Sequence, residues 1–376
     1  MATDISQLLD AGDFSSQLKQ LINDPMTTFG PTVRPYLGAN YLPEVVKPLN
    51  KYKEEGIKYR SVPANHGTAY SPAQIKGGIM TGEMDVELAF SDIAAQMTAA
   101  DYDAFVRLLR KIYDKAGSAN AGVTPPSMDA MVQMMQWADR SLVQPLAIRN
   151  EIDRWQAICY GQVPLSGNNG YNDLVVYPNI SGHRVTAGGT WSDNSYDPIP
   201  DITARLNFLR RKGYNPIQLI TSVDVETILI NNQQVRQRAG ILSLTSGAIT
   251  GLSALLAPTD LANVFRQNNI PAYIVYDATY TTQTGFNWFL PRDTVVIVCA
   301  TGRNEEISRG DLEPVVLYDT LGYTGIGTVS GQPDPGKHVY IEPRLVKPVS
   351  IYGEAYQASL PVITDPEAMA AITGIA

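Results

Sequence analysis

Residues 47–90 constrain the fold most, because they have the pattern of a long hairpin arm that is too polar to fold alone. The outgoing side is basic, the returning side is acidic, and Gly77, Gly78 and Gly82 interrupt the return. A two-stranded hairpin without a covering layer is at best marginal in water. We therefore expect the arm to lie on another copy of the chain, which favours assembly over catalysis. The candidate contact residues are Lys51, Lys53, Lys58, Arg60, Lys76, Glu83, Asp85 and Glu87.

Length and charge limit the folds and functions that this chain can have. A chain of 376 residues exceeds the size at which one core usually stops growing, so we expect two lobes with extensions. The net charge is -8, from 37 acidic and 29 basic residues. This balance argues against a surface built mainly to grip phosphates, so nucleic acid is expected as a neighbour and not as a tightly held ligand.

Cys159 and Cys299 are the only cysteines, and their spacing indicates neither a disulfide framework nor a zinc site. We expect two buried free thiols in a reducing compartment. The first residues lack the basic region and apolar run of a signal peptide, and no stretch is apolar for long enough to cross a bilayer. A protein made and kept in the cytoplasm, with no membrane partner, is the expectation.

The first half reads as extended segments followed by helices. Residues 4–23 carry a helical apolar stripe, and prolines recur through 25–48, which favours a strap that reaches a neighbouring subunit. One helix is predicted at 98–117 and a longer one at 127–161. Pro145 should bend the longer helix, because proline cannot donate to the carbonyl four residues back.

The second half has the pattern of a small α/β lobe over about 198–331. Two strands, 174–177 and 183–186, are predicted as a hairpin, followed by a helix over about 200–212. A strand over 216–222, a helix after a Ser222 cap, and paired strands at 272–277 and 294–300 complete the prediction.

No motif nominates an active site. Residues 331–337, GQPDPGK, have the spacing of a phosphate-binding loop, but His338 stands where Ser or Thr should hold magnesium, and a strand pattern follows. His66 and His183, like His338, lie at no metal-ligand spacing with another His or Cys, so hydrogen-bonded or surface roles are expected. We therefore nominate no catalytic, cofactor-binding or metal-binding residue.

The serial order of several segments carries a family resemblance. These are IDRWQAICYGQV (152–163), DLVVYPNISGHRVTAGG (173–189), the turn Trp191–Asp193, PIPDITARLNFLRRKG (198–213) and EAYQASLPVITDPEAMAAI (354–372). In this order the chain resembles the major capsid proteins of tailed double-stranded DNA bacteriophages, in particular the lambda-type E family.

The resemblance implies an α+β fold of the Hong Kong 97-like phage capsid type. Its parts would be an N-arm (1–46), an E-loop (47–90), a peripheral domain (91–197) with spine helix 127–161, an axial domain (198–334), and a return to the peripheral domain (335–376). In some relatives, a covalent bond between a lysine of the E-loop and an asparagine joins neighbouring subunits. Lys58 and Lys76 lie there, but no matching Asn or Glu context is present, so uncrosslinked subunits are expected.

The function that the resemblance implies is structural. Copies of the chain would form hexamers and pentamers of an icosahedral shell around phage genomic DNA, in a virion capsid assembled in the cytoplasm of a bacterial host. Portal, scaffolding and decoration proteins would be its partners, and no cofactor would be needed. Two alternatives stay open: an encapsulin-like compartment shell, and a soluble α/β enzyme with a pocket of convergent polar groups.

Overall fold

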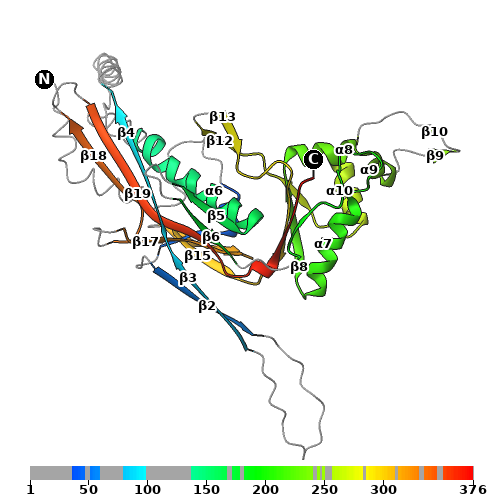
Figure 1. Ribbon diagram of the computed structural model, residues 1–376, viewed down its shortest axis with the longest axis horizontal. Helices are drawn as coiled ribbons and strands as arrows, with labels where there is room; N and C mark the ends of the chain where they lie inside the picture. The colour runs from blue at the N-terminus through cyan, green and yellow to red at the C-terminus, as the bar shows by residue number, and fades with distance from the viewer. Residues whose placement is uncertain are drawn as a thin grey trace, which may run out of the picture.

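The computed structural model describes residues 36–46, 51–59, 79–98, 137–166, 172–177, 182–239, 244–245, 248–249, 256–282, 285–309, 312–329, 334–344 and 350–375. Figure 1 shows an elongated part around strand β19 and helix α6, and a second part around helices α7, α8 and α10. A hairpin of strands β2 and β3 extends away from both parts (Figure 1).

The elongated part is built on a five-stranded sheet, which we call the first sheet. Its strands are β1 (Glu44–Val46), β4 (Ala89–Met97), β17 (Gly322–Gly327), β18 (His338–Arg344) and β19 (Ser350–Ile363). β19 pairs antiparallel with β4 along one edge and with β17 and β18 along the other. β1 adds to β17 in parallel, so a segment near the start of the chain joins strands from near its end.

A long helix crosses one face of the first sheet. It consists of a π-helical turn, η1 (Asp139–Val143), and helix α6 (Gln144–Tyr160). Pro145 is the second residue of α6 and lies inside this continuous helix, and the π-helical turn before α6 accommodates the hydrogen bond that proline cannot donate. Gly161, with φ of 66°, caps the end of α6. The predicted start of this helix, at residue 127, lies outside the described residues.

Contact between this helix and the first sheet is close. Leu142 and Leu146 pack against Ile351 and Ala355 in one buried cluster. Gly353 makes the approach possible, because a Cβ placed there would lie 2.8 Å from Cδ1 of Leu142.

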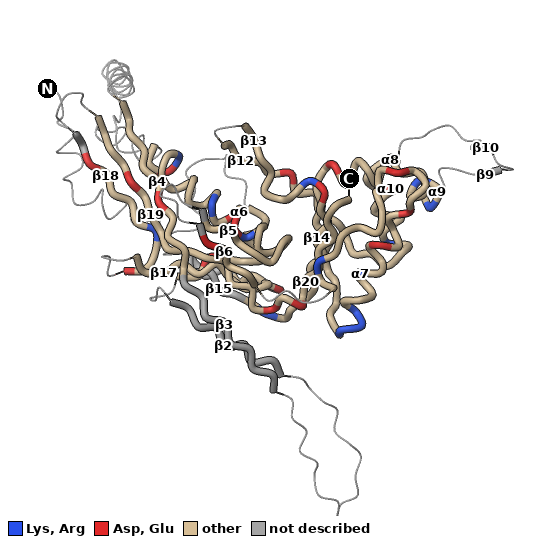
Figure 2. The backbone as a smooth tube through the Cα atoms, viewed as in Figure 1, with Lys and Arg blue, Asp and Glu red and all other residues tan. Residues whose placement is uncertain are grey.

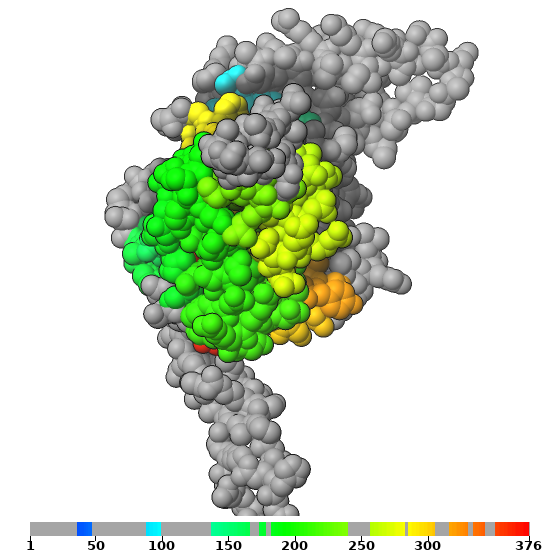
Figure 3. Space-filling model, turned by 90° about the vertical axis from the view of Figure 1, so that its right-hand side faces the viewer, coloured from blue at the N-terminus to red at the C-terminus, as the bar shows by residue number. Residues whose placement is uncertain are grey.

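A second sheet, in the order β11-β8-β14-β20-β7, forms the middle of the other part. Its strands are β7 (Arg184–Thr186), β8 (Asn215–Thr221), β11 (Tyr273–Val275), β14 (Val295–Ala300) and β20 (Met369–Thr373). Helices α7 (Ile199–Arg211), α8 (Val223–Asn231), α9 (Gln233–Arg238) and α10 (Pro258–Gln267) belong to this part. Much of the face in Figure 3 is formed by this part of the chain, in green to yellow.

The structure corrects two predicted strand pairings. Strand 174–177 does not pair with 183–186: β6 (Asn172–Val176) pairs with β5 (Gln162–Ser166), whereas β7 pairs in parallel with β20. The strands predicted at 272–277 and 294–300 are not partners either, because both pair with β8. β6 keeps a partner that is near in the sequence, whereas β7, β11 and β14 pair with more distant strands than predicted.

The remaining described elements are short. They are α3 (Gly38–Tyr41), η2 (Pro366–Ala368), and the antiparallel pairs β9 (Leu244–Thr245) with β10 (Ala248–Ile249), β12 (Thr279–Thr282) with β13 (Gly285–Trp288), and β15 (Asn304–Arg309) with β16 (Leu312–Tyr318).

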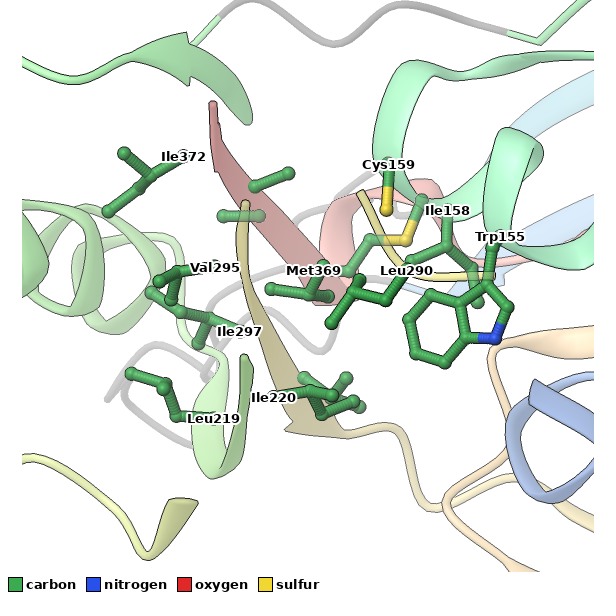
Figure 4. Close-up of a cluster of buried hydrophobic side chains, with 14 of the residues drawn as sticks. Trp155, Ile158, Cys159, Leu219, Ile220, Leu290, Val295, Ile297, Met369 and Ile372 are labelled. Atoms are coloured by element: carbon green, nitrogen blue, oxygen red, sulfur yellow. The ribbon is translucent and has the colours of Figure 1, made fainter. Parts of the chain in front are cut away.

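One buried cluster joins α6 to the second sheet. Figure 4 shows Trp155, Ile158 and Cys159 from α6 near Met369 from β20, with Ile220 of β8 and Val295 of β14 beyond. Cys159 and Cys299 are both buried and unbonded, as predicted.

The strand pairings cross the predicted domain boundary near residue 334. β17, which precedes this boundary, lies in the first sheet, and β20, which follows it, lies in the second. The division into N-arm, E-loop, peripheral and axial domains stays a prediction, and the sheets do not follow its limits.

Candidate interaction surfaces and a buried charge cluster

The hairpin predicted from charge and glycine placement is present in the structure. β2 (Lys51–Tyr59) pairs antiparallel with β3 (Ile79–Glu87). The register sets Lys51 opposite Glu87 and Lys53 opposite Asp85, whereas Glu55 stands opposite Glu83. Lys58 stands opposite Met80. Arg60 and Lys76, the other two candidate contact residues, lie outside the described residues.

The face of the first sheet turned away from α6 is exposed, and we call it the open face. It carries Phe90, Asp92, Ala94 and Gln96 from β4, Tyr352, Glu354 and Tyr356 from β19, and His338, Tyr340 and Glu342 from β18. The side chains of Phe90 and Tyr340 are 58% and 53% exposed.

An aromatic row crosses the three strands of the open face. Tyr356 lies between Phe90, with ring centroids 6.2 Å apart, and His338, at 5.5 Å. Asp92, Glu342 and Glu354 supply acidic charge, and Arg344 is a basic position of the same alternation at the end of β18. Figure 2 shows acidic positions in red along β4, β18 and β19. Exposed aromatic groups that lie together are typical of an interaction surface.

Behind the first sheet lies a buried cluster of charged groups centred on helix α6. The Glu151 side chain is fully buried, and its Oε1 accepts hydrogen bonds from Gly38 N at 2.8 Å, Trp155 Nε1 at 2.7 Å and Tyr276 OH at 2.9 Å. Its Oε2 lies 3.3 Å from Arg154 Nη1. Burial, followed by the charge of Glu151, raises the pKa of Tyr276, so its hydroxyl keeps its proton.

Glu44 extends this cluster to the start of the first sheet. Its carboxylate accepts from Lys337 Nζ at 2.7 Å and Asn150 Nδ2 at 2.8 Å, and lies 3.3 Å from Arg154 Nη2. Burial alone would raise the pKa of Glu44, but the positive charges of Lys337 and Arg154 outweigh it and lower this pKa to about 2.

The same contacts argue against a phosphate site at the phosphate-loop pattern. Lys337 is 8% exposed and its amine is held by Glu44, so it does not point to a phosphate site. Strand β18 begins at the next residue, as the sequence predicted. Among the described residues, no group of three or more His, Cys, Asp or Glu side chains could hold a metal ion. None of the helices within the described ranges is long and apolar enough to cross a membrane.

The sequence analysis missed the buried charge cluster. Glu151 and Arg154 are three residues apart on a helix, which is a weak signal, and Lys337 stood out only as part of the phosphate-loop pattern. No sequence signal pairs Glu44 with Lys337, because they meet only after β1 has joined the first sheet.

The fold is similar to that of a capsid protein assigned to a prophage of E. coli CFT073. The two chains are 14% identical, the match covers 96% of this chain and 98% of that chain, and the TM-score is 0.57. This is a phage capsid protein fold of the Hong Kong 97-like type, so the predicted α+β fold class is confirmed.

The chain belongs to the phage major capsid protein E family, because the family model matches residues 119–373, more than half of the chain. It is therefore a structural protein of a virion capsid and not an enzyme, and the enzyme alternative falls.

Two further similarities are lower. A phage-related protein from Bordetella bronchiseptica RB50 is 14% identical, with 96% of each chain covered and a TM-score of 0.49. The SrpI encapsulin from Synechococcus elongatus PCC 7942 is 10% identical, with 95% of this chain and 94% of that chain covered and a TM-score of 0.38. Scores this low do not bear on the function. Among curated proteins, none matches the chain significantly.

Proposed function

We propose that copies of this chain assemble into hexamers and pentamers that close an icosahedral shell around phage double-stranded DNA. Membership in the phage major capsid protein E family supports this proposal. Two structural features of the subunit carry the proposal. Hairpin β2–β3 extends away from its own subunit (Figure 1), and the open face presents Phe90 and Tyr340 to solvent.

The contact that we propose is the hairpin of one copy on the open face of a neighbouring copy. Strand β2 carries Lys51, Lys53 and Lys58, and the open face is acidic. Exposed ion pairs contribute only about 0 to 1 kcal/mol each. A closed shell repeats every contact in each subunit, so small energies add up to a large avidity.

The remaining candidate contact residues belong to the same proposal. Arg60 and Lys76 lie toward the tip of the arm in sequence, whereas Glu83, Asp85 and Glu87 lie on the returning strand, where their charge suits basic groups of a neighbour. Portal, scaffolding and decoration proteins are proposed as further partners.

DNA is proposed as the content of the shell and not as a tightly bound ligand. The net charge of -8 leaves little driving force for gripping phosphates. An encapsulin-like shell around a cargo enzyme is the alternative on the same fold. Nuclease-protected DNA inside particles purified from an infected host supports the phage shell, whereas a protein cargo without DNA supports the alternative.

A deletion within the hairpin tests the proposal. Gly56 stands opposite Gly82, so deleting residues 57–81 leaves a two-residue Gly-Gly turn between the paired Glu55 and Glu83. β2 and β3 pair only with each other and belong to neither five-stranded sheet, so we expect a folded subunit by circular dichroism that forms no closed shells in negative-stain micrographs. The control exchanges Ile57 and Thr81, which stand opposite each other, and should assemble. Closed shells from the deletion variant would contradict the proposal.

A further inference from the structure

Residues 36–46 lie between two stretches of chain, residues 1–35 and the hairpin arm, and are fixed to the body at successive positions. The carbonyl of Tyr41 accepts from Leu321 N at 2.9 Å, and that of Pro43 accepts from Thr324 N at 2.7 Å. Thr324 Oγ1 also donates to the carbonyl of Leu42 at 2.9 Å. We call residues 36–46 the root of the arm.

The side chain of Glu44 is the main polar attachment of this root. It is 10% exposed and binds three groups from two other parts of the chain: Asn150 and Arg154 on α6, and Lys337 directly before β18. Arg154 in turn donates from Nε to Thr324 Oγ1 at 2.9 Å, so the guanidinium bridges Glu44 to β17. Asn150 and Arg154 belong to helix α6, and Lys337 directly precedes strand β18.

Replacing one member of such a set leaves the others buried without their counter-charge. An unpaired buried charge is strongly unfavourable, so the chain would move to bring water to it. The element able to move is β1, because it is three residues long and pairs on one edge only, with β17. Helix α6 and β18 are held by much longer contacts.

We propose that Glu44 is a positioning residue: bound by Lys337 and Arg154, it fixes the direction in which the chain leaves the body toward hairpin β2–β3. β1 ends at Val46 and β2 begins at Lys51, so a small rotation of β1 is passed on through four residues to the whole arm. The effect on shell formation rests on the proposed function, whereas the position of the root does not.

The chain allows this position to be measured directly. Cys159 and Cys299 are buried, so spin labels would attach to introduced cysteines and not to the native ones. Val46 is 50% exposed at the root, and Ala262 is exposed on α10 in the other part of the molecule. V46C/A262C protein, diluted with unlabelled protein to suppress distances between subunits, gives the label separation by pulsed electron resonance.

We expect one narrow separation in the parent protein and a shifted or at least two-fold broader distribution after Glu44→Gln or Lys337→Met. Lys337→Arg keeps the charge and should restore the parent distribution. Asp153→Asn is the matched control, because it removes another buried carboxylate from α6, one that is paired with Arg149 and not with the root. A general loss of stability would not broaden the distribution in Glu44→Gln and Lys337→Met while leaving Lys337→Arg and Asp153→Asn like the parent.

Two outcomes would overturn the inference. One is a distribution in both Glu44→Gln and Lys337→Met identical to that of the parent. The other is equal broadening by Asp153→Asn. If Glu44→Gln fails to fold, Lys337→Met, which removes one of three partners, still decides the question. Failure of the parent protein itself to form shells would count against the proposed function and not against this inference.

Discussion

Lys212 Nζ lies 2.9 Å from Nε2 of His183, so an ammonium group donates a hydrogen bond to a neutral imidazole. The other ring nitrogen, Nδ1, lies 2.7 Å from the carbonyl oxygen of Met369 and donates to it. His183 is almost fully buried, with its ring edge-on to Phe208. The pair ties α7 to the beginning of β20, and a proton on Nε2 would set two cationic donors against each other.

The first prediction is that acid weakens the fold through His183. Burial is the largest cause that lowers the pKa of this side chain, and Lys212 and Arg184 lower it further, against the hydrogen bond to Met369 and the charge of Glu367. The folded state therefore binds the proton less readily than the unfolded state, whose pKa is about 6.5. Stability is fully present above that value and falls as the pH drops below it.

Thermal unfolding between pH 5 and pH 7.5 checks this prediction. The midpoint of the parent protein should fall toward pH 5, and His183→Gln, which cannot take up the proton, should show a smaller fall. An equal slope in both proteins would assign the acid sensitivity to another group.

The second prediction concerns Asp153, whose protonation should stabilise the folded protein instead of weakening it. Burial raises the pKa of this carboxyl group to about 6, although Arg149 opposes the shift. The folded state then binds a proton more readily than the unfolded state. The charged Asp153 carboxylate therefore destabilises the folded protein above pH 6, and this destabilisation disappears as the pH falls from 6 toward 4. We expect Asp153→Asn to raise the free energy of unfolding at pH 8 by about 1 to 3 kcal/mol. Denaturant titrations at pH 8 and pH 4.5 test this, and an equal effect at both would contradict it.

The third prediction concerns the close approach at Gly353. A Cβ at this position would meet Leu142 and the Trp137 ring, at 2.8 and 2.9 Å. Gly353→Ala should therefore destabilise by about 1 to 3 kcal/mol, the usual range for an overpacked core. Gly325→Ala is the control in the same sheet, because its nearest neighbour would be at 3.5 Å, an ordinary contact. Similar effects of both changes on denaturant unfolding would refute the packing argument.

Local signals in the sequence predicted local structure well. Ser222 accepts a hydrogen bond from Val225 N at the start of α8, and the helix predicted at about 200–212 runs over Ile199–Arg211. Strand partners were predicted less well. β7 pairs with β20, although most of the second half of the chain separates the two strands in sequence. Proximity in sequence favours hairpins, but the pairings in the final sheet join segments far apart in the sequence, which local patterns do not specify.

The candidate contact residues were also only partly foreseeable. A basic outgoing side, an acidic returning side and the glycines indicated the hairpin, but the cross-strand register, with Lys51 opposite Glu87, cannot be deduced from composition. The open face could not be recognised in advance. Phe90, Tyr340 and Tyr356 lie on three strands that are adjacent only after folding, and each alone resembles a core residue.

The fourth prediction separates contacts within the hairpin from contacts between subunits. Reversing Lys51, Lys53 and Lys58 to glutamate should impair assembly more than subunit stability, and most strongly at low salt. The register supplies the matched variant: K51E/E87K and K53E/D85K together restore opposite charges across the hairpin but still present reversed strands to a neighbour. We expect this exchange to assemble poorly as well. Wild-type yields from the exchanged protein would assign the lysines to the hairpin itself.

An electron cryomicroscopy reconstruction of particles formed by the expressed protein would show where the hairpin lies. We expect closed icosahedral shells in which hairpin β2–β3 of one subunit lies over β4, β19 and β18 of the next, with density covering Phe90 and Tyr340. Protein that stays monomeric under assembly conditions, or shells in which that face is exposed and the hairpin lies elsewhere, would contradict it.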